Sequence, residues 1–177
     1  DEIITEESRP GNDFLANLCK DWEREAMKAV GIGVRVVAIR TGIVLDKTDG
    51  ALPKLLLPFK FFVGAYQGSG KQWLSWIHID DIVSLYTYAI ENEELAGPVN
   101  GTSPEPVTNK EFVKSAGHIL KRNLVIPAPA FALRLAIGDF AESLLTGQRV
   151  VPEKAIESGF KFAFPDLNSA LKNLITS

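Results

Sequence analysis

Apolar residues recur at intervals of three and four along the first part of the chain. Between Asp13 and about Val30 these positions are Phe14, Leu15, Leu18, Trp22, Ala26 and Val30. The spacing predicts an amphipathic helix, capped by Asn12 or Asp13 and stopped at Gly31. The next run, VRVVAIR at residues 34–40, is β-branched and nearly continuously apolar. Such a run is typical of a strand buried on both faces of a parallel sheet, so the pattern predicts an α/β fold.

Helices and connections alternate up to residue 101. A helix is predicted from Ile79 to about Glu91, with Asp80 or Asp81 in its first turn, where negative charge complements the helix dipole. The other predicted segments are a loop at 41–50, a largely helical stretch at 51–62, a glycine-rich connection at 63–72 and a short strand at 98–101.

From Thr102 onward the pattern changes, because proline becomes frequent and the predicted elements become short. Thr108 and Glu111 have the spacing of a capping box, which predicts a helix from Asn109 to Leu120. The remaining predicted elements are a strand at 124–127, a helix at 129–145, a helix led by Pro152 and a closing helix after Pro165. We therefore expect two units, residues 1–101 and 102–177.

Composition excludes several classes of partner. The formal net charge is -3, and no cluster of Lys and Arg is dense enough to indicate a nucleic-acid partner. Apolar stretches such as LPKLLLPFKFF are broken by Pro and Lys, so we expect no membrane partner. The single cysteine, Cys19, favours a reducing, cytoplasmic location. The abrupt acidic start, DEIITEESRPGN, does not resemble a signal peptide and suggests a fragment.

The stretch GSGKQWLSWIHIDD at residues 68–81 opens like a phosphate-binding loop. A P-loop requires a glycine five positions before Gly70 and a hydroxyl directly after Lys71, but these positions hold Ala65 and Gln72. The P-loop interpretation therefore fails, and a connection that leads into a helix is the better prediction.

Metal and nucleophile chemistry are also poorly supported. In an extended segment His78 and Asp80 share a face and Asp81 points away, so we predict a helix start rather than a metal site or an acid–base dyad. His118 falls inside a predicted helix, and Cys19 lies on an amphipathic helix without a nearby histidine, so both are predicted to be structural. The best ligand-contact candidate is AIRTGIVL, because ligands of open α/β sheets bind at the carboxyl ends of strands.

Three segments in order, RVVAIRTGIVL, GSGKQWLSWIHIDDIV and PVNGTSPEPVTNKEF, resemble the later half of the extended short-chain dehydrogenase/reductase superfamily, in its epimerase/dehydratase branch. The tail LLTGQRVVPEKAIESGFKFAFPDLNSAL is similar to the C-terminal domain of a nucleoside-diphosphate-sugar epimerase-like subgroup. The resemblance covers nearly the whole chain. It implies the later part of a Rossmann-type, doubly wound parallel sheet in residues 1–101, with a substrate-side insertion near 47–77, and a small α/β substrate domain in residues 102–177.

The resemblance also implies NADP or NAD as cofactor and an unidentified small molecule as substrate. The sequence leaves open whether the protein forms a homo-oligomer. The G-x-G-x-x-G fingerprint is absent, so this chain cannot assemble the pyrophosphate site. We expect dinucleotide binding by the chain alone to be absent or very weak. The residues implied on the cofactor side are Arg40, Thr41, Gly42 and Ile43. Those implied on the substrate side are Gln72, Leu74, Trp76, His78 and Arg149.

The superfamily uses a Tyr-x-x-x-Lys pair, and in the epimerase branch a glutamate commonly follows four residues later. If Glu23 matches this glutamate, the lysine position is Cys19 and the tyrosine position is Leu15. Neither residue can do this chemistry, so we assign no catalytic residue. Two hypotheses follow: the later part of an NAD(P)-dependent oxidoreductase or epimerase-like enzyme, or a cofactor-sensing or partner-binding protein that kept the fold without the reaction.

The branch pattern around residues 68–81 places an arginine where this chain has Leu74. The resemblance implies that this arginine pairs with the diphosphate of a sugar nucleotide, a contact that leucine cannot replace. We therefore expect a substrate other than a nucleoside-diphosphate sugar, such as a small carbonyl compound that contacts Trp73 and Trp76.

Overall fold

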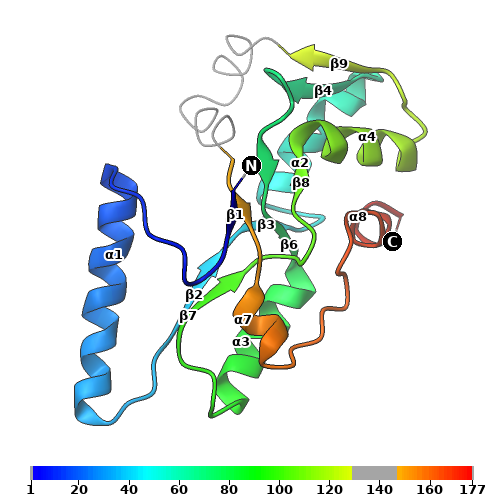
Figure 1. The fold of residues 1–177 in the computed structure, drawn as a ribbon. Coiled ribbons are helices and arrows are strands. Elements are labelled where there is room, and N and C mark those ends of the chain that lie inside the picture. Colours follow the sequence, from blue (N-terminus) through cyan, green and yellow to red (C-terminus); the bar gives the residue numbers. More distant parts are fainter. Residues whose placement is uncertain (1, 129–146, 177) are drawn as a thin grey trace.

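The computed structural model of the chain describes residues 2–128 and 147–176, so the helix expected at 129–145 lies outside the described residues. Its strands pair mostly in parallel and alternate with helices (Figure 1), which confirms the predicted α/β fold. The parallel pairs are β1 (Ile3–Ile4) with β10 (Arg149–Val150), β2 (Val37–Thr41) with β7 (Gly97–Gly101), β3 (Ile43–Leu45) with β6 (Trp76–His78) and β4 (Gly64–Gln67) with β9 (Val125–Ala128). One pair is antiparallel, β5 (Trp73–Leu74) with β8 (Val107–Thr108).

Helices α1 (Phe14–Met27) and α4 (Asn109–Ile119) begin where the sequence supplies side-chain caps. Asp13 accepts a hydrogen bond from the Ala16 N–H at the start of the first helix. Thr108 and Glu111 form both hydrogen bonds of the predicted capping box. The helices and 3₁₀ turns are α1 (Phe14–Met27), η1 (Lys28–Ile32), α2 (Ala51–Leu56), η2 (Leu57–Phe61), α3 (Ile79–Glu91), α4 (Asn109–Ile119), α7 (Glu153–Glu157) and α8 (Leu167–Thr176). None of these helices has the length and apolar character needed to cross a bilayer.

Three segments differ from the expectation, and the first is the loop expected at 41–50, which contains β3 paired in parallel with β6. The strand expected at 34–40 begins only at Val37, because Gly33 adopts a left-handed conformation (φ 83°) and the Val34 N–H still bonds back to Ala29. The connection expected at 63–72 contains β4, which pairs with β9. Since β9 lies far along the chain, no local pattern could indicate this strand.

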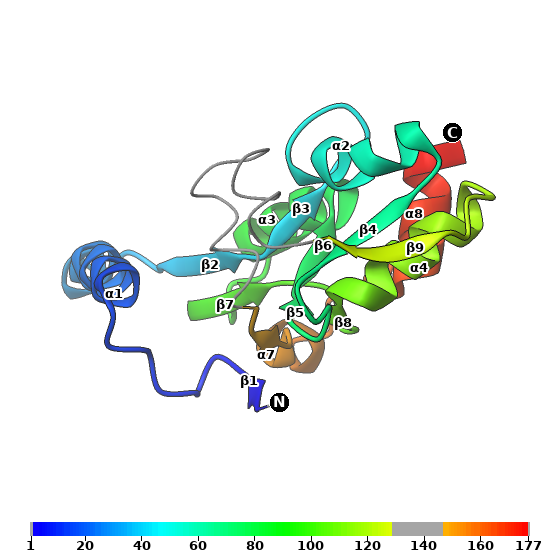
Figure 2. The same ribbon diagram turned by 90° about the horizontal axis from the view of Figure 1, so that it is seen from above.

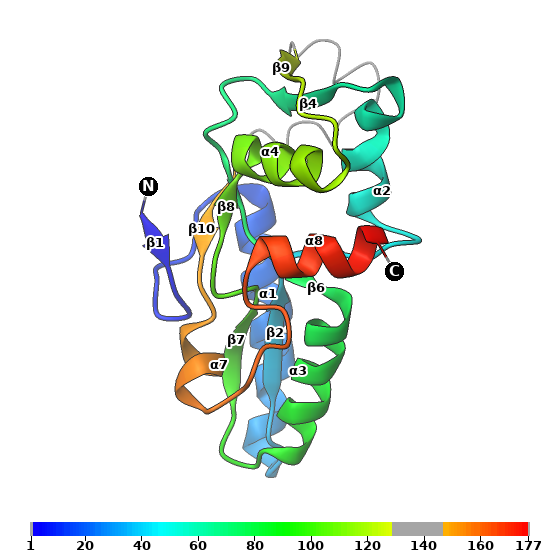
Figure 3. The ribbon, with the colours of Figure 1, turned by 90° about the vertical axis from the view of Figure 1, so that its right-hand side faces the viewer.

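Helices lie on both sides of the β2–β7 pair. Figures 2 and 3 show α3 on one side of this pair and α7 on the other, as in a doubly wound sheet. By contrast, α1 stands apart from the other helices at one side of the molecule (Figures 1 and 2). The carboxyl end of β2 points away from α1 and leads directly into β3 (Figure 2).

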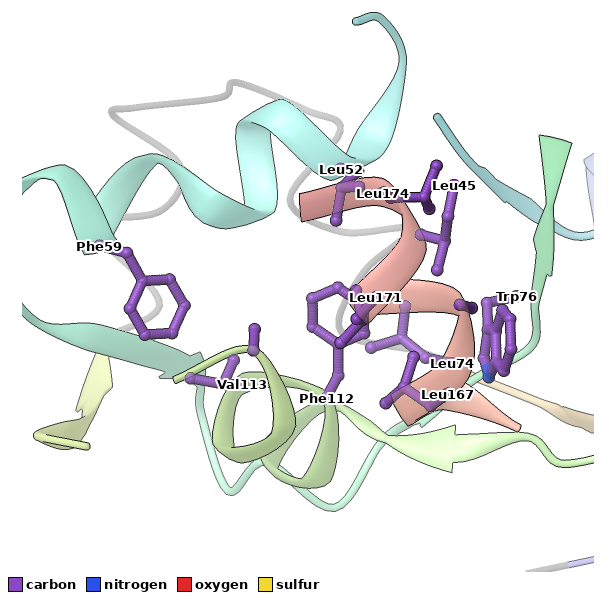
Figure 4. Packing of buried hydrophobic residues seen from close by; sticks show 12 residues of the cluster. Leu45, Leu52, Phe59, Leu74, Trp76, Phe112, Val113, Leu167, Leu171 and Leu174 are labelled. Atoms are coloured by element: carbon purple, nitrogen blue, oxygen red, sulfur yellow. The ribbon is translucent and has the colours of Figure 1, made fainter. Parts of the chain in front are cut away.

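The buried apolar side chains form two clusters. The larger lies between α2, α4 and α8 and includes Trp76, Phe112 and Leu171 (Figure 4). The smaller lies between α3, α7 and the β2–β7 pair and includes Ile77 and Phe160. Residues 147–176 contribute to both clusters, and the division of the chain at residue 101 stays a prediction.

Candidate functional site

The loop after β2 crosses closely over two neighbouring strands. The Gly42 N–H donates to the Gly101 carbonyl at 2.9 Å, and the Ile43 N–H donates to the Ser75 carbonyl at 2.8 Å. A Cβ atom on Gly42 would lie 2.5 Å from the Ser75 carbonyl oxygen and 2.9 Å from Cγ2 of Thr102. Only glycine fits this crossing, which brings the predicted cofactor-side loop against Ser75 and Thr102.

Arg40, at the end of β2, is engaged by helix α1. Its Nε and Nη2 atoms donate to the two carboxylate oxygens of Glu23 at 2.7 and 2.8 Å. The hydrogen bond from Arg40 lowers the pKa of Glu23, and the same bond raises the pKa of Arg40. A cofactor contact by Arg40 would therefore compete with Glu23, whereas the side chain of the neighbouring Thr41 is exposed.

Replacing Glu23 with Gln is expected to lower the free energy of unfolding by about 0.5–1 kcal/mol at neutral pH, as for a solvent-screened ion pair. Because the folded chain lowers the pKa of Glu23, its stabilisation is complete above the ordinary value of 4.5 and is lost as the pH falls through the lower, folded value. Urea denaturation at neutral and acidic pH should show the difference from the unmodified chain shrinking in acid. Glu25→Gln, whose partner Lys28 lies on the surface, is the control, and equal losses in both variants would contradict the prediction.

Residues 73–76 alternate between the core and the opposite face. Leu74 and Trp76 are 3% and 0% exposed and pack in the larger cluster (Figure 4), whereas Trp73 and Ser75 point the other way. Gln72, just before β5, donates from Nε2 to the Gln67 carbonyl at 3.0 Å. Substrate contact by Gln72, Leu74 and Trp76 stays a prediction, and the structure gives each of them a contact within the chain.

Arg149 lies beside the outward-facing residues of this strand. Its guanidinium stacks 4.6 Å from the centre of the Trp73 ring. The Ser75 hydroxyl donates to the Gln148 carbonyl at 2.6 Å and accepts the Val150 N–H at 2.9 Å, which fixes the backbone on both sides of Arg149. Within the described residues, Nε of Arg149 is buried without a hydrogen-bond partner. We refer to Gly42, Trp73, Ser75 and Arg149 as the Arg149 site.

His78 is buried and caps helix α3. Its Nδ1 accepts the Asp80 N–H at 3.0 Å, so Nε2 carries the hydrogen and donates to Oδ1 of Asn173 at 3.2 Å. The ring also stacks on Phe164, with centroids 3.8 Å apart. With both nitrogens committed, His78 holds the C-terminal segment, and its predicted place on the substrate side stays untested.

Asp81 has a similar role. It is 1% exposed, and its carboxylate accepts the backbone N–H groups of Ala163 and Phe164 at 2.7 and 3.0 Å. In the part of the chain that the structure describes, no three His, Cys, Asp or Glu side chains are grouped as metal ligands. The pair Asp80–Asp81 starts a helix, as the sequence predicts, and Asp81 also fastens the tail.

Comparison with known proteins places this geometry in a family. Residues 128–174 match a family model described as a domain of unknown function, DUF1731. The chain is 41% identical over 176 residues to the epimerase family protein YfhF of Bacillus subtilis, covering 99% of this chain and 58% of that protein. The crystal structure of the human epimerase family protein SDR39U1 (isoform 2) with NADPH matches with a TM-score of 0.87 at 36% identity, over 99% of this chain and 60% of that one. The chain is a homologue of the epimerase family proteins.

A second solved structure supports this assignment. The nucleoside-diphosphate sugar epimerase from Corynebacterium glutamicum matches with a TM-score of 0.75 at 35% identity, over 97% of this chain and 33% of that one. The family expected from RVVAIRTGIVL and the tail is confirmed. This epimerase-family homologue spans less than two thirds of the length of these relatives. A site that a full-length relative forms therefore need not lie entirely within this chain.

Helix α1 carries the residues that fall at the superfamily's tyrosine and lysine positions if Glu23 matches the family's glutamate, and this match stays a prediction. Leu15, Cys19 and Glu23 are one turn apart and so share a face, and Glu23 reaches Arg40 at the end of β2. Leu15 is 64% exposed, and Cys19 is also exposed. An alkyl group and a thiol therefore occupy the positions at which the resemblance implies tyrosine and lysine.

The sequence interpretation missed Ser75. Ser75 joins the segment after β2 to β10. Its carbonyl accepts the Ile43 N–H, and its hydroxyl bonds to the backbone of Gln148 and of Val150, on either side of Arg149. The signal was present, since strand periodicity puts Ser75 on the face opposite Leu74 and Trp76.

Proposed function

We propose that this chain forms the substrate-side part of an NAD(P)-dependent oxidoreductase or epimerase-like protein, whose substrate is a small molecule other than a nucleoside-diphosphate sugar. The observation that carries the proposal is the Arg149 site, where a guanidinium nitrogen is buried without a partner in the described residues and Ser75 connects the Arg149 backbone to the segment after β2. Ligands of open α/β sheets bind at the carboxyl ends of strands. The NADPH in the human SDR39U1 structure supports a nicotinamide cofactor.

The residues at the end of β2 fit one side of a dinucleotide site. Thr41 is exposed there, and Gly42 lets the loop pass against Ser75 without a protruding side chain. The chain lacks the glycine-rich fingerprint for the pyrophosphate, so the segment 40–43 would border the cofactor without holding its phosphates. A bound nicotinamide would supply hydride transfer.

The side chains around Arg149 favour a substrate with one hydrogen-bond acceptor and an apolar body. Nε of Arg149 can donate to a carbonyl or carboxylate oxygen, and the indole of Trp73 offers an apolar surface. Leu74, which occupies the position of the family's diphosphate-binding arginine, is packed in the core and brings no second positive charge. A small carbonyl compound suits this set better than a diphosphate.

A second candidate is a cofactor-sensing protein without turnover. Leu15 and Cys19, at the tyrosine and lysine positions, favour it because neither can exchange a proton as the superfamily's pair does. The two candidates share the cofactor and differ in the reaction.

The chain alone is expected to show no micromolar binding in an NADPH fluorescence titration, because most of the phosphate contacts are missing. Joined to the part of YfhF that it does not span, it is expected to bind NADPH. Cofactor oxidation against a panel of small carbonyl compounds then separates the candidates: turnover supports the enzyme, and tight binding without turnover supports the sensor. Failure of the joined, folded protein to bind NADPH would contradict both.

In that joined protein, Arg149→Met is expected to lower kcat/KM, or ligand affinity if there is no turnover, by about 10–100-fold. This is the range for a lost hydrogen bond from a charged donor. NADPH affinity should stay unchanged. Arg24→Met, which changes an exposed arginine of α1 paired with Asp21, is the matched control. Equal effects of the two variants would exclude Arg149 from the substrate side.

A further inference from the structure

Two side-chain polar atoms in the described residues are buried without a hydrogen-bond partner, Nε of Arg149 and Oε1 of Gln67. The first belongs to the Arg149 site, whereas Gln67 has no role in the site as described above. Gln67 is the last residue of β4 and is 4% exposed. Buried amides in folded proteins are nearly always hydrogen-bonded, because an unpaired acceptor away from water lowers stability. The unpaired Oε1 therefore indicates a missing donor.

The backbone of Gln67 is held on both sides. Its N–H donates to Oδ1 of the buried Asn109 at 2.8 Å. Its carbonyl accepts Nε2 of Gln72 at 3.0 Å and the Gly70 N–H at 2.8 Å. In addition, β4 pairs with β9 up to Ala128, which lies opposite Gln67. These contacts fix the point from which the side chain starts, and they use none of its side-chain polar atoms.

Gln67 points away from the larger apolar cluster. Side chains alternate between the two faces of a strand. Tyr66 packs against that cluster, and a Cβ atom on Gly64 would lie 2.8 Å from the ring of Phe59, which belongs to it. Gly64 and Tyr66 thus share the cluster side of β4, and Gln67 lies on the opposite side.

The Arg149 site lies on the corresponding side of the next strand. In β5, Leu74 fills the larger cluster, while Trp73 lies on the other face, where Arg149 stacks on its ring. The turn between the two strands is closed by the hydrogen bond from Gln72 to Gln67, directly before Trp73. Consecutive strands therefore carry Gln67 and the Trp73–Arg149 pair on the side away from the cluster.

We infer that Gln67 is a specificity-determining residue of the Arg149 site, where its Oε1 accepts a hydrogen bond from a hydroxyl group of the substrate. This role rests on the proposed function and narrows its substrate class. Nε of Arg149 donates to a carbonyl oxygen, Oε1 of Gln67 accepts from a hydroxyl, and the Trp73 ring contacts the carbon chain between these groups. The substrate is thus a small hydroxycarbonyl compound rather than a simple ketone or aldehyde.

The stability of the chain alone separates this role from a structural one. An amide that holds the fold bonds to its neighbours, as the Asn109 side chain does with the Gln67 N–H. An amide kept for a ligand lowers the stability of the empty protein instead. Gln67→Met keeps the length of the side chain and removes its polar atoms, so the urea midpoint should stay equal or rise. A clearly lower midpoint would assign Gln67 to the fold and overturn the inference.

Hydroxyacetone and butanone test the substrate class, because they differ only by a hydroxyl group in place of a methyl group. In the joined protein with NADPH, hydroxyacetone should bind, or be reduced with a kcat/KM, about 5–10-fold better than butanone. The longer pairs of the series, with two or three carbons between the carbonyl and the hydroxyl, are compared in the same way by ligand-observed NMR and NADPH oxidation.

Gln67→Met should abolish the preference by weakening the hydroxyketones alone. Asn123→Leu, which removes an exposed amide from the segment before β9, is the matched control and should keep the preference. Equal binding of both members of every pair, or a preference that Gln67→Met leaves intact, would overturn the role of Gln67. The proposed function would still stand if Arg149→Met weakens both members of a pair. If no ketone of any pair binds, both the role of Gln67 and the proposed substrate class fail.

Discussion

Asp81→Ala is expected to destabilise the chain by about 3 kcal/mol, one of the two largest effects that the structure predicts. The carboxylate is 1% exposed and accepts the N–H groups of Ala163 and Phe164. Without it, two backbone donors lose the carboxylate that accepts from both of them. The segment that leads to α8 would then lose its attachment to the start of α3.

Urea denaturation followed by circular dichroism measures this loss, with an expected fall of about 1–2 M in the midpoint for a chain of this size. Trypsin should also cleave sooner at Lys161, which lies in the released segment. Asp80→Ala is a close control, because Asp80 is the preceding residue in the same helical turn but its side chain is 69% exposed. A midpoint for Asp81→Ala no lower than that of Asp80→Ala would show that the carboxylate does not hold the tail.

Gly42→Ala is expected to cost about 3 kcal/mol, at the upper end for overpacking. The added Cβ would lie 2.5 Å from the Ser75 carbonyl oxygen, which is itself bonded to the Ile43 N–H. Because the obstacle is backbone, no side-chain rotation can relieve the contact. Either the loop after β2 or strand β6 must move, and Arg149 depends on Ser75 for its position.

The measurement is again the urea midpoint, together with the near-ultraviolet signal of the tryptophans, which reports whether Trp73 and Trp76 keep their surroundings. Gly31→Ala is the control, since a Cβ there meets nothing within 4 Å. It should change the stability by no more than about 0.5 kcal/mol. If both alanine variants unfold at the same urea concentration, the crossing at Gly42 is more tolerant than its geometry indicates.

Elements with local signals could be predicted from the sequence. Helix α3 has the predicted bounds, and α4 ends one residue before the predicted Leu120, because apolar spacing, acidic first-turn residues and a capping box all lie within the helices themselves. Strand β4 was missed because its hydrogen bonds go to β9, whose position no local pattern encodes. The N-cap of α3 was also missed, since histidine is an unusual cap and its role depends on Asn173 and Phe164, both distant in the sequence.

The candidate site was less predictable than the fold. The strand end at Arg40–Thr41 could be expected because a strand end can be recognised locally, but the engagement of Arg40 by Glu23 depends on the placement of α1. Arg149 was implied by resemblance alone, and its stacking on Trp73 requires the tail to return to β5. Such contacts are set by tertiary packing, which the spacing of residues along the sequence does not predict.

The alternation of residues 73–76 has an evolutionary consequence. Leu74 and Trp76 are constrained by the core that they fill, whereas Trp73 and Ser75 lie on the other side of the segment, beside Gln148–Val150. Substitutions at the even positions therefore act through folding, whereas under our proposal substitutions at the odd positions would act through the Arg149 site. Under our proposal, four consecutive residues would thus separate positions that maintain the fold from positions at which ligand specificity could change.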